Sequence, residues 1–143
     1  MGARREIKTF VENERPQQSS FLEPGQDCWG SVKQRIDIQL DTIDEYCGLA
    51  GIDHIDVLKS DTQGFDLDVL RGANTMFERK RVRLVYIEVI FSSMYQGLPR
   101  VDETLKFLFG HGFRLVSFYD MHYQNDLLGW TDVLLVEPAY SVK

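Results

Sequence analysis

The feature that most constrains the fold is the alternation of strand-like and helix-like segments from residue 41 onward. Its clearest member is VRLVYIEVIF (82–91), whose β-branched and aromatic side chains favour a buried strand. The expected order is helix, strand, helix, strand, helix, strand, strand, over residues 42–51, 55–59, 65–76, 82–91, 102–110, 113–119 and 131–137. Because alternating units form right-handed crossovers, we expect an α/β fold with a mainly parallel sheet. The last strand lacks a preceding helix, so we expect it to be antiparallel.

The chain has 143 residues, a length that suits one α/β domain with one core. Residues 1–31 are expected to be an irregular N-terminal segment of that domain, with one possible short strand at 7–12. Pro16 and the following polar residues break any periodicity there. In residues 32–40, VKQRIDIQL, apolar side chains recur mostly at every second position, which predicts a half-buried strand.

Residues of characteristic backbone preference mark the expected ends of the elements. Asp41 is expected to cap the following helix, and Gly51 to end it in a left-handed conformation. Gly72 is a weak point within the helix expected at 65–76. Residues 121–129, MHYQNDLLG, are expected to form a polar connection between the last two strands.

Composition and charge exclude several classes of partner. An apolar content of 43% is typical of a globular protein, and a net charge of -6 disfavours binding to nucleic acid or to an anionic membrane. No apolar run approaches the ~18 residues of a membrane span, and the N-terminus does not resemble a secretory signal. Two cysteines without metal-type spacing, Cys28 and Cys47, suit a reducing compartment. We therefore expect a cytoplasmic protein without nucleic-acid or membrane partners.

Two carboxylates stand at expected strands where ligands of α/β proteins bind. Asp61 follows the strand that ends near Lys59, and Glu88 lies inside VYIEVIF. The crevice outside the carboxyl ends of the strands is the usual ligand site, and burying a carboxylate is unfavourable unless it has a partner. Asp61 could instead only cap the next helix, with Gly64 easing the turn. Glu88 could instead point to solvent from an edge or strand end.

Spacing argues against metal sites and nucleophilic triads. A calcium loop needs acids at positions one, three and five before its glycine, whereas Gly64 lies three residues after Asp61. The histidines are scattered, without a partner at zinc-ligand spacing: His54, His111 and His122. No serine stands in a G-x-S-x-G frame, and neither cysteine lies at a glycine-bounded elbow. No metal is expected.

The sequence has no glycine-rich nucleotide cradle. Such a cradle follows a strand and opens a helix, but the only G-x-G, Gly110 to Gly112, ends a helix and enters a strand. The residues therefore look like the second half of a doubly wound domain, whose ligand-cradling first half is expected to be absent from this chain.

The segment Leu40–Ala73, LDTIDEYCGLAGIDHIDVLKSDTQGFDLDVLRGA, is followed by VYIEV and later by HGFRLV. This pattern resembles the FkbM family of S-adenosylmethionine-dependent methyltransferases. The most specific part is the K-x-D-x-x-G-[FA]-[ED] core before L-x-V-L-[KR]-G-A, and the likeness extends over about residues 7–137. Two positions depart from the family pattern. Gln63 stands where the family has an acid before the glycine, and Asp66 replaces a glutamate.

The resemblance implies the C-terminal half of a Rossmann-like class I methyltransferase fold. It implies S-adenosylmethionine as cofactor, and O-methylation of a hydroxyl on a small molecule or glycan. Asp61 would position the acceptor or remove its proton and, with Thr62, contact the cofactor; Glu88 is the second catalytic candidate. Because the main cofactor motif is missing, we expect this chain alone to bind the cofactor weakly or not at all.

A different reading also fits the sequence. The chain could be a non-catalytic α/β interaction module or an inactive truncated fragment. The sheet edge that the missing strands would cover could pair with a second copy, which would give a homo-oligomer.

Overall fold

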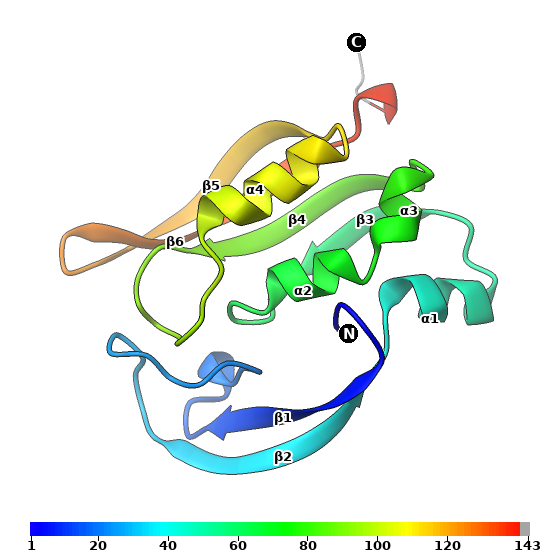
Figure 1. Ribbon diagram of the computed structural model, residues 1–143. Coiled ribbons are helices and arrows are strands. Elements are labelled where there is room, and N and C mark those ends of the chain that lie inside the picture. Colours follow the sequence, from blue (N-terminus) through cyan, green and yellow to red (C-terminus); the bar gives the residue numbers. More distant parts are fainter. Residues whose placement is uncertain (141–143) are drawn as a thin grey trace.

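A computed structural model describes residues 1–140 and shows a four-stranded sheet with helices on one face, above a separate two-stranded sheet (Figure 1). The strands are β1 (Glu6–Asn13), β2 (Val32–Leu40), β3 (Ile55–Ser60), β4 (Val82–Ile90), β5 (Arg114–Gln124) and β6 (Leu127–Val136). The helices are α1 (Ile43–Ala50), α2 (Asp66–Arg71), α3 (Asn74–Glu78) and α4 (Val101–Gly110), with short 3-10 helices η1 (Pro16–Gln18) and η2 (Pro138–Tyr140).

The larger sheet has the strand order β3-β4-β6-β5. β3 and β4 are parallel, whereas β6 is antiparallel to both of its neighbours, β4 and β5. Three strands therefore run in one direction, and the last strand is inserted among them in the opposite direction. This arrangement confirms a mixed α/β fold with an antiparallel last strand.

The possible short strand at 7–12 is confirmed as β1, and the N-terminal segment 1–31 also contains the short helix η1, which was not expected. β1 pairs with β2 as an antiparallel hairpin outside the main sheet. A chain of aromatic rings joins this hairpin to the main body: Phe10 contacts Phe21, and Phe21 contacts Phe65, each with ring centroids 5.0 Å apart. The strand expected at 32–40 is confirmed, but its partner is β1.

The predicted cap of α1 was wrong by one residue. The N-cap is Thr42, whose side chain accepts a hydrogen bond from the backbone N–H of Glu45 at 3.0 Å. The carboxylate of Asp41 instead lies 3.3 Å from Arg5. Gly51 does end the helix in a left-handed conformation, with φ of 67°, as expected.

The single helix predicted over 65–76 is two short helices, α2 and α3, separated at Gly72. The N-terminus passes close to this break, and a Cβ at Gly72 would lie 2.1 Å from the carbonyl oxygen of Gly2. The carboxylate of Asp44 accepts a hydrogen bond from the backbone N–H of Thr75 at 2.8 Å. A residue from α1 thus satisfies an amide at the start of α3 and favours a new helix there.

The polar connection predicted at 121–129 was also wrong. β5 continues to Gln124 and β6 begins at Leu127, so these residues form the end of a long β-hairpin. Asn125 and Asp126 make the turn, with φ of 52° and 63°. Two consecutive left-handed residues give a tight turn whose twist matches that of the strands.

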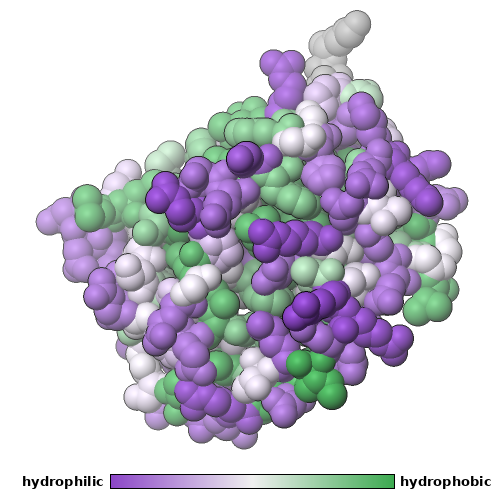
Figure 2. Space-filling model, in the orientation of Figure 1, coloured by the Kyte–Doolittle hydropathy of each residue, from purple (hydrophilic) through white to green (hydrophobic). Residues whose placement is uncertain are grey.

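The core lies between the main sheet and the helices. Its most buried members have exposed fractions of 0%: Leu70, Ala73, Val82, Val85, Ile87, Leu108, Val133 and Leu135. The outer surface on this side is largely hydrophilic, with smaller hydrophobic areas between the charged side chains (Figure 2). No helix formed by residues 1–140 has the length and apolar content needed to cross a membrane.

Candidate active site

The site begins at the turn between β3 and α2. Gln63 and Gly64 both have positive φ, 53° and 88°, and this reverses the chain after Asp61. A Cβ on Gly64 would lie 2.5 Å from a methyl carbon of Leu98, so glycine is needed for both backbone conformation and space.

Asp66, rather than Asp61, stabilises this turn from within. Its carboxylate accepts hydrogen bonds from the hydroxyl of Ser60 at 2.5 Å and from the backbone N–H of Thr62 at 3.1 Å. Burial raises the pKa of Asp66, and the hydrogen bond from Ser60 opposes that shift. The N-cap residue of α2 is Phe65, so the interpretation of Asp61 as a helix cap was wrong.

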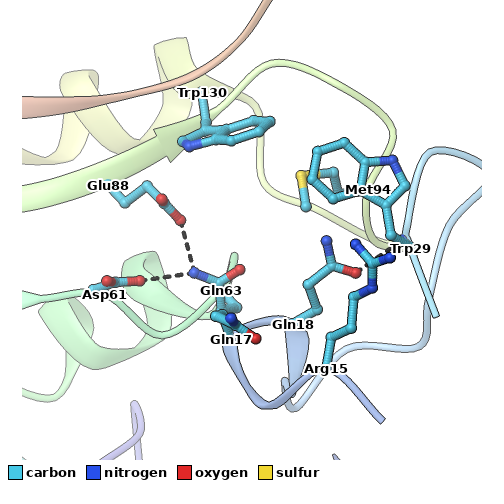
Figure 3. Close-up of a pocket in the computed structure, with 9 residues that line it drawn as sticks. All are labelled: Arg15, Gln17, Gln18, Trp29, Asp61, Gln63, Glu88, Met94 and Trp130. Carbon is cyan, nitrogen blue, oxygen red and sulfur yellow. Dashed lines mark hydrogen bonds between the residues drawn. The ribbon is translucent and has the colours of Figure 1, made fainter. Parts of the chain in front are cut away.

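Gln63 joins the two carboxylates that sequence reasoning selected (Figure 3). Its side-chain nitrogen donates to Asp61 Oδ1 at 2.8 Å and to Glu88 Oε2 at 3.0 Å. Its side-chain oxygen accepts a hydrogen bond from the hydroxyl of Tyr95 at 2.9 Å. The fold therefore brings together an acid directly after β3, Asp61, and an acid within the neighbouring strand β4, Glu88.

Glu88 is half-buried in β4, opposite Asp132 of β6. Burial is the largest cause that raises its pKa to about 8, followed by the charges of Asp61 and Asp66. The hydrogen bond from Gln63 acts in the opposite direction by stabilising the charged form. Glu88 faces a pocket and is partly withdrawn from water, so the solvent-facing alternative was wrong.

The pocket beside the two acids has a volume of about 340 Å³. The labelled residues of Figure 3 line it: Arg15, Gln17, Gln18, Trp29, Asp61, Gln63, Glu88, Met94 and Trp130. The indoles of Trp29 and Trp130 meet edge to face with centroids 5.9 Å apart, and His122 stacks on Trp130 at 4.9 Å. The backbone N–H of Trp29 donates to the side-chain oxygen of Gln18 at 2.8 Å, which holds the Trp29 loop against η1.

Sequence reasoning missed both tryptophans. Trp29 belongs to the segment expected to be irregular, and Trp130 directly precedes the strand expected at 131–137. The available signal was a large aromatic side chain in an otherwise polar stretch, since exposed tryptophans are uncommon unless they contact another molecule. Their separation of 101 positions along the chain hid their proximity.

Thr62 lies on the other side of the turn. It lines a second hollow of about 470 Å³ with residues of α1 and β3, and Asp61 borders both spaces. The hydroxyl of Thr62 is buried and lies on the side of the Asp66 carboxylate, where it favours the charged form and lowers the pKa of Asp66. Within residues 1–140, no group of three or more His, Cys, Asp or Glu side chains is placed to hold a metal ion.

Comparison with known proteins places this site in a family. A sequence model of the Methyltransferase FkbM domain matches residues 5–115. The chain belongs to the FkbM methyltransferase family. The match contains Asp61, Thr62, Gln63 and Glu88 and ends before Trp130. One wall of the pocket therefore comes from outside the matched region.

One curated relative is the 2-O-methyltransferase NoeI of Sinorhizobium fredii (strain NBRC 101917 / NGR234). It is 26% identical over 100 residues, which cover 70% of this chain and 40% of the relative. The chain thus spans about 40% of the length of that protein. No solved structure matches this FkbM chain significantly.

Proposed function

We propose that this FkbM domain takes part in methyl transfer from S-adenosylmethionine to a hydroxyl group of a small molecule or glycan. The observation that carries the proposal is the pair of carboxylates, Asp61 and Glu88, held by one amide at the wall of a pocket. The acceptor oxygen must lose a proton as it gains the methyl group, so a positioned base contributes directly to the reaction.

The two acids suit different roles. Glu88 has a pKa of about 8, which gives it the proton affinity of a base working at neutral to mildly alkaline pH. Asp61 is exposed and can accept a hydrogen bond from the acceptor hydroxyl, which would orient the oxygen. Acids in contrasting environments are a common way to divide these tasks.

The pocket suits a ring-shaped polar acceptor. Its volume of about 340 Å³ lies within the range of small-molecule sites, about 300–1,000 Å³. Trp29 and Trp130 supply apolar surface for the C–H groups of a ring, while Gln17 and Arg15 supply hydrogen-bond donors for its hydroxyls. The name of the relative NoeI, a 2-O-methyltransferase, supports an oxygen acceptor.

The fold supports the cofactor assignment in part. We infer that the strands β3 to β6 are the C-terminal half of a Rossmann-like class I methyltransferase, with β3 at the edge of the sheet. Asp61 borders both hollows, and Thr62 lines the second one. These two residues would hold the methionine end of S-adenosylmethionine, which supplies the methyl group when bound. The other side chains of the Thr62 hollow are mostly apolar, and they fit the rest of the cofactor less well.

Calorimetry and a transfer assay test the proposal. S-adenosylmethionine and its demethylated product should bind this chain weakly. Any longer form of the protein encoded with it should bind both compounds more tightly. Transfer of a radioactive methyl group to saccharide acceptors should fall at least about tenfold in Glu88→Gln and in Asp61→Asn. Absence of binding heat from every form would contradict the proposal.

A second candidate function rests on a specific surface. The sheet carries a hollow of about 590 Å³ whose lining includes Asp56, Arg83 and Tyr140 and, from four strands, the apolar residues Val57, Leu84, Val116, Leu134 and Val136. Val57 and Val116 lie on the edge strands β3 and β5 and are about half exposed, at 54% and 51%. We propose that this surface and the adjoining sheet edge support self-association as a non-catalytic module. Sedimentation that shows only monomer at high concentration would contradict it.

A further inference from the structure

The amide of Gln63 uses all of its hydrogen-bonding groups in the site. One N–H goes to Asp61 at 2.8 Å and the other to Glu88 at 3.0 Å, while the oxygen accepts from Tyr95 at 2.9 Å. The hydroxyl of Tyr95 can act as a donor to this oxygen, so the nitrogen side of the amide must face the acids. The amide therefore has one orientation that satisfies every neighbour.

The backbone of Gln63 is fixed independently of the acids. Its carbonyl oxygen accepts a hydrogen bond at 2.7 Å from the hydroxyl of Ser20, a residue only 1% exposed. Tyr95 is 4% exposed and also reaches the carbonyl oxygen of Gln18 at 3.3 Å. The N-terminal segment and the loop after β4 thus hold Gln63 from two sides.

A different side chain at position 63 would change the balance of charge. An uncharged amide stands at this position between two acids. Glutamate would place a third carboxylate against Asp61 and Glu88, and like charges at this distance disfavour each other's ionised form. Leucine would leave both carboxylates without their shared donor.

We propose that Gln63 is a positioning residue that holds the Asp61 and Glu88 carboxyl groups side by side and thereby aligns them with the acceptor hydroxyl. We call the two hydrogen bonds from the Gln63 amide to Asp61 and Glu88 the clamp. Its catalytic role rests on the proposed methyl transfer, but the clamp itself is a property of the folded chain. Because Gln63 donates to the charged form of Glu88, its removal must make Glu88 harder to ionise.

NMR titration of the Glu88 side-chain carboxyl carbon in the 143-residue chain tests the clamp. In Gln63→Leu we expect the pKa of Glu88 to rise by about one unit above the wild-type value. Gln17→Leu is the matched control, because Gln17 is an exposed glutamine that lines the same pocket, and it should leave this pKa unchanged. An unchanged Glu88 pKa in Gln63→Leu would overturn the proposal.

A reciprocal exchange separates the clamp from a general structural role. Gln63→Glu should destabilise the protein at about pH 8, and adding Glu88→Gln should restore most of that loss, since the pair regains one amide and one carboxylate. If Gln63→Leu does not fold, Gln63→Asn replaces it, because its amide is one methylene too short to reach both acids. If the changes in the free energy of unfolding caused by Gln63→Glu and Glu88→Gln simply add in the double variant, the clamp is refuted. The pKa and stability measurements do not depend on enzymatic activity. They therefore test the clamp even if the chain does not catalyse methyl transfer.

Discussion

Glu88 makes the stability of the folded protein depend on pH. The pKa of this carboxyl is raised from its ordinary value of 4.5 to about 8 in the folded protein. The folded state therefore binds the proton more tightly than the unfolded chain does. Stability from this residue is fully present below about pH 4.5 and is lost as the pH rises towards 8. Glu88→Gln replaces the carboxyl with a neutral amide and should remove that loss.

The size of the effect follows from the shift. Each pH unit well between the two pKa values changes the free energy of unfolding by about 1.4 kcal/mol. Because the titration curves flatten near each pKa, the unscreened change between pH 5 and pH 8 would be about 3.5 kcal/mol. Water at the pocket mouth screens part of this interaction, and we expect about 2 kcal/mol. In urea, with a slope of about 2 kcal/mol per molar, the midpoint of wild type should fall by about 1 M relative to Glu88→Gln.

Urea unfolding of both proteins at pH 5 and pH 8 measures the effect. The matched control is Glu14→Gln, which makes the same chemical change at an exposed position of the N-terminal segment. Its midpoint should follow that of wild type at both pH values. If wild type and Glu88→Gln keep a constant difference in midpoint between the two pH values, the pKa of Glu88 is not raised in the folded protein.

The remaining predictions concern turns, caps and rate. Gly64→Ala should destabilise the protein by about 2 kcal/mol, because φ of 88° disfavours any Cβ. The control Gly48→Ala lies in α1, where a Cβ meets open space, and should be neutral or stabilising. Equal thermal midpoints for the two variants would contradict this. Thr42→Ala should lower the free energy of unfolding in urea by about 1 kcal/mol, and Asp41→Ala should lower it by less than about 0.5 kcal/mol. The reverse order would show that Asp41 is the cap of α1. The rate of methyl transfer should rise with pH through about 8 as Glu88 ionises, and a flat profile would exclude it as the base.

Part of the site could be predicted because the relevant signals are local. Asp61 stands directly after a strand, and Glu88 interrupts an apolar strand, so each is unusual within a few residues of sequence. The rule that ligands bind beyond the carboxyl ends of strands then places both acids at one edge of the sheet. Gln63 was seen only as a departure from the family pattern. Its role depends on the distance to Glu88, 25 residues further on.

Local periodicity by itself determined most elements of this FkbM domain, including β4, α4 and the antiparallel last strand, because apolar spacing reports which face of a segment is buried. Only the tertiary structure decided the division of α2 from α3 and the meeting of Trp29 with Trp130. Asp44 caps α3 from another helix, and the two indoles come from segments 101 residues apart. Such contacts depend on where the folded chain returns in space, and no local pattern of side chains records that distance. The two acids were therefore visible in the sequence, whereas the amide that joins them and the aromatic wall beside them were not.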